Sequence, residues 1–220
     1  MAAFNAAAEN GAHMIELDVS LSVDRQLVVL HDDTVDRTTN GCGSVDALTF
    51  KELQGLDAGS WFDPRFHGER IPALAQVLDE VKDRLMVNVE IKPNAFEPHG
   101  PVDAVERQVL ELIHANDMGD DIIVSSFEWQ VLETLRLLDP HIALGLLSDR
   151  PADENLRYWI NRIDGFSWHP DSRVLTPSQV ASLHELGAKV LPYAVGSRID
   201  AQQMLAMGVD GLIVDNPNWV

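Results

Sequence analysis

The chain has 220 residues, of which 45% are apolar and 23% are charged, a composition typical of a globular protein with a sizeable core. Its formal net charge of −19 argues against a nucleic-acid or membrane-surface protein, because both need a basic face. The single cysteine, Cys42, excludes an intrachain disulfide framework and a multi-cysteine zinc site, and no apolar run reaches the roughly 18–20 residues of a membrane span. We therefore expect a small-molecule partner, no nucleic acid and no stable membrane insertion.

The first predicted elements are a helix and a pair of strands. Residues 2–10 are rich in alanine and predict a helix that ends at Gly11, and strands are predicted at 14–19 and 27–31. A parallel crossover needs about a dozen residues, so the short polar connection at 20–26 predicts that the second strand returns antiparallel to the first. No charged segment with an apolar core precedes the helix, so the sequence as written has no signal peptide and we expect a cytoplasmic protein.

A long irregular segment, residues 32–73, follows the second strand. Only one short helix is predicted in it, at 49–56. Loops of this length inside a domain are usually functional or poorly ordered. Because this one carries Trp61, Phe62 and Phe66, we expect it to fold as a cap over a site.

From residue 74 onward, helices and strands alternate regularly. Predicted helices cover 74–82, 102–115, 129–138, 155–160, 177–186 and 200–207, and predicted strands cover 85–92, 121–127, 142–147, 164–168, 189–195 and 211–215. These strands are nearly continuous apolar runs, the pattern of a parallel sheet covered by helices. No linker or low-complexity stretch interrupts the alternation, so we expect a single domain over residues 1–220.

The number of strands indicates the architecture. Without the antiparallel return, seven parallel strands are predicted, one fewer than in a (β/α)₈ TIM barrel, a fold that usually takes about 250 residues. Such a barrel should open on a strand, whereas this chain opens on a helix. We therefore predict an α/β fold of the (β/α)₈ barrel type that lacks its first strand.

Polar side chains gather at the ends of two predicted strands. Glu16 and Asp18 share one face of the first strand, and Glu90 and Lys92 share one face of the strand at 85–92. Catalytic residues of a barrel lie at the carboxyl ends of its strands, and three carboxylates without His or Cys ligands favour a hard cation such as Ca²⁺ or Mg²⁺. Lys92 adds a positive charge for a phosphoryl oxygen, and His31 is able to exchange a proton near neutral pH. Together these residues predict a metal-dependent phosphodiester-cleaving site.

The order of several motifs resembles one family of enzymes. The chain contains, in this order, IELDVSLSVDRQLVVLHDDTVDRTTNG, LDAGSWFDPRFHGERIPAL, VNVEIKP, IVSSFEWQVLETLR and GVDGLIVDNP. The combination of ELDV, HDD-x-x-DRTTNG and EIKP is highly specific, and the resemblance to the glycerophosphodiester phosphodiesterase family covers essentially the whole chain.

This resemblance implies a (β/α)₈ barrel that hydrolyses glycerophosphodiesters to sn-glycerol 3-phosphate and an alcohol. It implies that Glu16, Asp18 and Glu90 bind a divalent cation, Ca²⁺ or Mg²⁺, and that Lys92 contacts the phosphate. It also implies that His31 is one of two acid/base histidines. In the family's mechanism, the glycerol 2-hydroxyl attacks phosphorus, and water then opens the resulting cyclic phosphate.

Two departures from the family pattern bear on the activity. The His-Arg-Gly motif of the first strand and the following Glu-Asn-Thr are absent, which agrees with the missing strand and suggests that the sequence begins at an internal methionine or belongs to a fragment. A secreted or periplasmic form therefore stays open. Tyr193 stands where many members have Trp; we expect it to line the substrate pocket together with Phe127 and Trp61.

Two alternative functions stay open at this stage. The missing motif is compatible with a non-catalytic barrel that binds a phosphate ester or a cation. The same residues would also serve a relative that acts on lysophospholipid or sphingomyelin-type head groups by transphosphatidylation. The long cap, rich in glycine and aromatic residues, favours the glycerophosphodiester branch over this relative.

Overall fold

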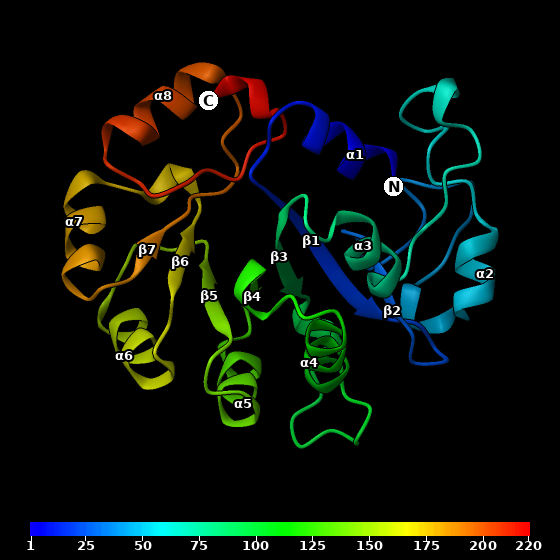
Figure 1. The fold of residues 1–220 in the computed structure, drawn as a ribbon, viewed down its shortest axis with the longest axis horizontal. Helices are drawn as coiled ribbons and strands as arrows, with labels where there is room; N and C mark the ends of the chain where they lie inside the picture. Colours follow the sequence, from blue (N-terminus) through cyan, green and yellow to red (C-terminus); the bar gives the residue numbers. More distant parts are fainter. The chain divides into compact units, whose positions relative to one another are not determined.

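A computed structural model describes all residues from Met1 to Val220 and divides them into two compact units, Met1–Ile122 and Ile123–Val220. Both units have α/β structure, and their elements are labelled in Figure 1. None of the helices combines the length and the apolar character that crossing a membrane would require.

The strands of the first unit surround β1 (Met14–Leu21). β2 (Leu27–Val29) pairs with it in antiparallel orientation, which confirms the predicted return, and β3 (Met86–Ile91) pairs with it in parallel. In the β1–β3 register, Glu16 lies opposite Asn88 and Asp18 lies opposite Glu90. Side chains opposite one another in register project from the same face of a sheet, so this pairing brings three acidic residues together.

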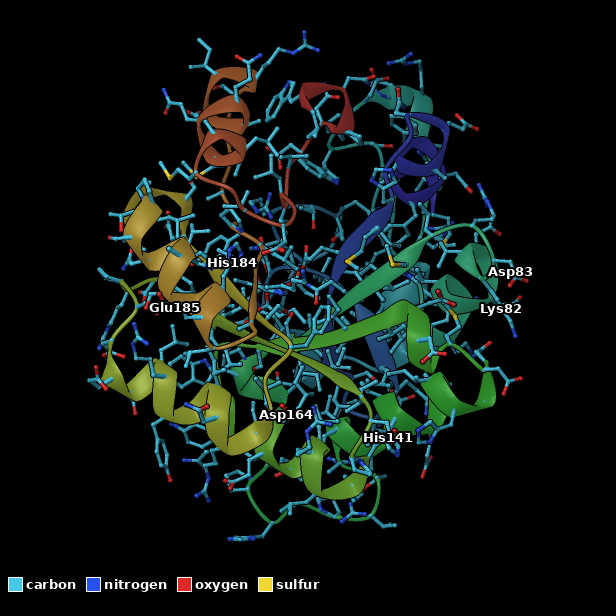
Figure 2. All side chains as sticks on the ribbon, turned by 60° about the vertical axis from the view of Figure 1, so that its left-hand side comes forward. Lys82, Asp83, His141, Asp164, His184 and Glu185 are labelled. Atoms are coloured by element: carbon cyan, nitrogen blue, oxygen red, sulfur yellow. The ribbon has the colours of Figure 1, made fainter.

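Four helices belong to the first unit: α1 (Ala2–Glu9), α2 (Phe50–Gly55), α3 (Leu74–Val81) and α4 (Val105–Ala115). α2 begins with a capping box in which the Thr49 side chain accepts from the Glu52 N–H and the Glu52 carboxylate accepts from the Thr49 N–H. The chain leaves α3 through Lys82 and Asp83, labelled in Figure 2, and Asp83 takes the left-handed conformation (φ 62°) that reverses the chain toward β3. The unit also contains 3₁₀ helices at Val45–Ala47, Pro64–Phe66 and Pro93–Ala95.

The long segment after β2 is an ordered part of the first unit. Its buried side chains form a small core with a residue of β2 (Val28, Val35, Val45, Leu53 and Ile71). The carboxylate of Asp57 closes its second half by accepting hydrogen bonds from the backbone N–H groups of Gly59 (3.0 Å), Ser60 (3.0 Å) and Gly68 (3.3 Å). A Cβ atom on Gly59 would lie 2.0 Å from the carbonyl oxygen of Phe66, so only glycine fits there.

The second unit contains four parallel strands, β4 (Ile122–Ser126, whose first residue ends the first unit), β5 (Ala143–Ser148), β6 (Ser167–Pro170) and β7 (Lys189–Val190). They alternate with α5 (Trp129–Leu138), α6 (Glu154–Ile163), α7 (Pro177–Glu185) and α8 (Arg198–Ala206). β5, β6 and β7 lie side by side in Figure 1. Further 3₁₀ helices are Gly119–Asp121, at the end of the first unit, and Ser172–Val174 and Pro217–Trp219.

One side chain fills the space left by a glycine in these strands. His169 of β6 is fully buried, and its Nε2 lies 2.8 Å from the Ser167 hydroxyl. A Cβ atom on Gly145 of β5 would lie 2.8 Å from both Cε1 and Nε2 of this imidazole. The absence of a side chain on β5 therefore makes room for the ring of His169.

The strand predictions are wrong in detail near the carboxyl end of the chain. The predicted last strand, 211–215, is reduced to a single bridge between Val195 and Val214, and β7 has only two residues. Pro192 lies between these short pairings and has no N–H to donate, so a continuous ladder cannot form. The strand predicted at 164–168 begins only at Ser167, because Asp164 ends α6 in the left-handed conformation (φ 49°; Figure 2).

Candidate functional site

Three carboxylates of the first unit converge on one face of its parallel strands β1 and β3. Glu16 and Asp18 project from β1 and Glu90 from β3, and one oxygen of each lies within 4.8 Å of one oxygen of the others. Asp18 and Glu90 are buried, and Glu16 is partly buried. The strand alternation explains this arrangement, since residues two apart on β1 share a face and the β1–β3 register adds Glu90 to that face.

Burial makes the ionised form of this carboxylate cluster unfavourable. Burial and the neighbouring charges of Asp18 and Glu90 raise the pKa of Glu16 to about 8. Burial and the charge of Asp18 raise the pKa of Glu90 to about 7, and burial also raises the pKa of Asp18. In addition, Glu90 Oε1 is buried and accepts no hydrogen bond. Mutually repelling oxygens, one of them a buried acceptor without a hydrogen bond, fit a hard divalent cation, which prefers oxygen ligands.

Lys92 is the basic residue of this cluster. Its Nζ lies 3.3 Å from Asp18 Oδ1 and 3.7 Å from Glu90 Oε1. Burial alone would lower the pKa of Lys92, but the charges of Asp18 and Glu90 outweigh this effect and raise it. The side chain therefore stays an ammonium at neutral pH, and it offers one positive charge beside three carboxylates.

His31 follows β2, and its side chain is 73% exposed. The N–H of the preceding Leu30 donates to the carbonyl oxygen of Asp18 (3.2 Å), which ties the end of this strand to β1. The Nδ1 of His31 lies 2.7 Å from Asp32 Oδ1, and Arg37 donates to both carboxylate oxygens of Asp32 at 2.6 and 2.8 Å. These hydrogen bonds hold the imidazole by one nitrogen.

The three aromatic residues predicted to line a substrate pocket lie in both units. Trp61 belongs to the first unit, is 50% exposed, and donates from Nε1 to the carbonyl oxygen of Ala58 (3.0 Å). Phe127 and Tyr193 belong to the second unit, where their rings pack edge to face with centroids 5.9 Å apart. Both aromatic groups expose ring surface, and their role in substrate binding stays a prediction.

Sequence reasoning missed three side chains around the carboxylate cluster. Asp32 and Arg37 hold His31, and their signal was present in the HDD-x-x-DRTTNG motif. Asn88 is buried opposite Glu16, and neither its Oδ1 nor its Nδ2 has a hydrogen-bond partner in the protein. The alternation of side chains along the strand predicts that Asn88 shares a face with Glu90. It does not predict that the Asn88 amide lacks hydrogen bonds.

Comparison with known proteins gives consistent results over the whole chain. The sequence model of the "Glycerophosphoryl diester phosphodiesterase family" matches residues 1–219. A glycerophosphodiester phosphodiesterase of Caldanaerobacter subterraneus is 38% identical over 218 residues, which cover 99% of this chain and 88% of the relative. A putative glycerophosphodiester phosphodiesterase of Bacillus subtilis is 35% identical over 222 residues, which cover 100% of this chain and 89% of the relative.

Solved structures extend this similarity to the fold. A phosphodiesterase of Oleispira antarctica in complex with the product sn-glycerol-3-phosphate matches with a TM-score of 0.89 and 27% identity, over 98% of this chain and 86% of that one. A glycerophosphodiester phosphodiesterase of Agrobacterium tumefaciens matches with a TM-score of 0.83 and 27% identity, over 98% of this chain and 89% of that one. These matches confirm the fold class expected from the sequence, an α/β fold of the barrel type.

Proposed function

The chain belongs to the glycerophosphoryl diester phosphodiesterase family, and on that premise we propose that it hydrolyses glycerophosphodiesters to sn-glycerol 3-phosphate and an alcohol. The observation that carries the proposal is the convergence of Glu16, Asp18 and Glu90 around Lys92. The product bound to the Oleispira antarctica relative supports the same reaction.

Each of these residues has a chemical task in the proposed reaction. Glu16, Asp18 and Glu90 would hold a divalent cation, Ca²⁺ or Mg²⁺, and this ion supplies positive charge to the phosphoryl oxygens when it is bound. The Lys92 ammonium would add a second positive charge for the same oxygens. His31 would move a proton through Nε2, because Nδ1 is engaged with Asp32.

Two proton transfers accompany the bond changes. When the glycerol 2-hydroxyl attacks phosphorus, it loses its proton, and the alcohol that leaves phosphorus gains one. When water then opens the cyclic phosphate, the water loses a proton and the glycerol 2-oxygen that leaves phosphorus gains one. We assign one transfer of each pair to His31.

The test is hydrolysis of glycerophosphocholine, followed by quantification of free sn-glycerol 3-phosphate with Ca²⁺, with Mg²⁺ and with a chelator. We expect turnover that depends on the cation and falls by about 10²-fold or more in Glu16→Ala and in His31→Ala. Asp79→Ala and His141→Ala serve as matched controls, because both side chains are exposed and lie outside the carboxylate cluster (His141 is labelled in Figure 2).

Other outcomes would favour the alternatives. Cation and phosphate-ester binding without any turnover would indicate the non-catalytic barrel. A cyclic phosphate that accumulates without opening would indicate the transphosphatidylating relative. Full activity in the Glu16→Ala protein would contradict the assignment of the carboxylate cluster as the cation site.

A further inference from the structure

We propose that Arg37 is a positioning residue for His31, acting through Asp32, and that its contact with Trp61 connects this arrangement to the long segment after β2. The inference rests on the proposed function, because it concerns the proton transfer assigned to His31. It gives Asp32 and Arg37 a positioning role that needs no contact with substrate, and it gives Trp61 a role besides the predicted pocket lining.

The first step is the hydrogen bond between His31 and Asp32. An ionised carboxylate only accepts hydrogen bonds, so the 2.7 Å contact with Asp32 Oδ1 requires the hydrogen of the neutral imidazole to lie on Nδ1. The hydrogen bonds from Arg37 and from His31 hold the pKa of Asp32 below its usual range. Asp32 is therefore ionised at neutral pH, and the basic lone pair of His31 lies on Nε2.

The second step is the orientation of Asp32. Arg37 donates from Nε to Oδ2 (2.6 Å) and from Nη2 to Oδ1 (2.8 Å), which fixes the plane of the carboxylate. Oδ1 is also the acceptor for His31, so a rotation of the carboxylate would move the imidazole. The side chain of His31 is largely exposed, so the hydrogen bond to Asp32 is what holds its ring.

The third step is the support of Arg37 itself. Its guanidinium carbon lies 5.8 Å from the centroid of the Trp61 ring, within the range of a cation–π contact. Trp61 is held by its own hydrogen bond to Ala58, whose N–H donates to the carbonyl oxygen of Glu69 (2.8 Å). The chain of contacts thus runs from the loop closed by Asp57, through Trp61 and Arg37, to Asp32 and His31.

An exposed ion pair by itself contributes little to stability, so an ordinary surface pair is the competing explanation. The same unit contains a pair that separates the two explanations. Arg65 donates to both oxygens of Asp63 at 3.0 Å and lies 5.9 Å from the Phe66 ring, but no histidine contacts Asp63. Arg65→Met is therefore a matched control for Arg37→Met.

The experiment measures the imidazole nitrogen chemical shifts of His31 in alkaline buffer, where the ring is neutral, and assigns them with His31→Gln. In the unmodified protein and in Arg65→Met we expect the tautomer with hydrogen on Nδ1. In Arg37→Met we expect a mixture of tautomers. We also expect a kcat for glycerophosphocholine that is about 10- to 100-fold lower at nearly unchanged KM. This loss is no larger than the roughly 10²- to 10⁴-fold that a general acid–base group contributes. Arg37→Lys should restore part of this loss.

Three results would overturn the proposal: an unchanged tautomer in Arg37→Met, an equal change in Arg65→Met, or a rise in KM with kcat preserved. The last would mean that Arg37 contacts the substrate. If the unmodified protein hydrolyses no glycerophosphodiester, the proposed function fails, and the tautomer of His31 still decides whether Arg37 positions the ring.

Discussion

Glu16 lies in an environment very different from that of an exposed carboxylate. Its ordinary pKa of 4.5 is raised to about 8, first by burial and then by the charges of Asp18 and Glu90. Lys92 opposes this effect with one positive charge against the two carboxylates. In a cation-free protein, the folded state therefore holds protons that the unfolded chain releases at neutral pH.

This difference predicts a stability that falls as pH rises. With a chelator present, the free energy of unfolding should decrease between about pH 4.5 and pH 8, because the unfolded state binds fewer protons than the folded state in this range. Ca²⁺ or Mg²⁺ should remove the decrease by pairing with the ionised carboxylates. Urea unfolding at several pH values in this range, on the unmodified protein and on Glu16→Gln, checks the prediction. An equal decrease of the unfolding free energy with pH in both proteins would contradict it.

His169 makes the folded state less stable as pH falls, whereas Glu16 makes it less stable as pH rises. Burial lowers the pKa of His169 from 6.5 to about 3, so the unfolded state takes up a proton that the folded state excludes. The resulting loss of stability begins as pH falls below about 6.5 and continues to about 3. His169→Gln should therefore lose less stability between neutral and acidic pH than the unmodified protein, whatever its stability at neutral pH. The exposed His141→Gln, which should follow the unmodified protein, is the control in the same denaturation series.

At the scale of elements, the sequence predicts the periodic parts well. The convergence of Glu16, Asp18 and Glu90 follows from alternation along two strands, and α5 has the same bounds as predicted. The contact of Arg37 with Trp61 could not be predicted, because it depends on how an irregular segment folds back, with Thr34 and Ser44 bridging. The prediction of one domain over residues 1–220 stays a prediction.

The closure of the long loop by Asp57 predicts a specific local weakness. Asp57 Oδ2 accepts from the Ser60 hydroxyl (2.7 Å) and the Gly68 N–H (3.3 Å) and pairs with His67, whereas the amide nitrogen of an asparagine accepts nothing. Asp57→Asn should open the loop without unfolding the core, because these bonds lie within the loop. Trypsin should cleave after Arg65 faster in Asp57→Asn than in the control Asp79→Asn. Equal cleavage rates with unchanged far-ultraviolet circular dichroism would contradict the prediction.

For the whole molecule, the dominant property is a formal net charge of −19. A field of this sign slows the approach of anions, and at about 0.1 M salt the Debye length shortens to about 10 Å. With the proposed activity, kcat/KM for a net-anionic substrate such as glycerophosphoglycerol should rise with added salt. The same constant for zwitterionic glycerophosphocholine should change little. Equal responses of both substrates to a salt series at fixed cation concentration would show that the overall charge does not act on substrate approach.

The packing of Gly145 against His169 also constrains how the sequence can diverge. A methyl group at position 145 displaces the imidazole, and a smaller residue at position 169 leaves a void beside the glycine. Each position thus determines what the other tolerates, and single changes at either one are penalised more than a matched double change. Among related proteins we expect the two positions to covary, so that a histidine on the one strand is inherited together with a glycine on its neighbour.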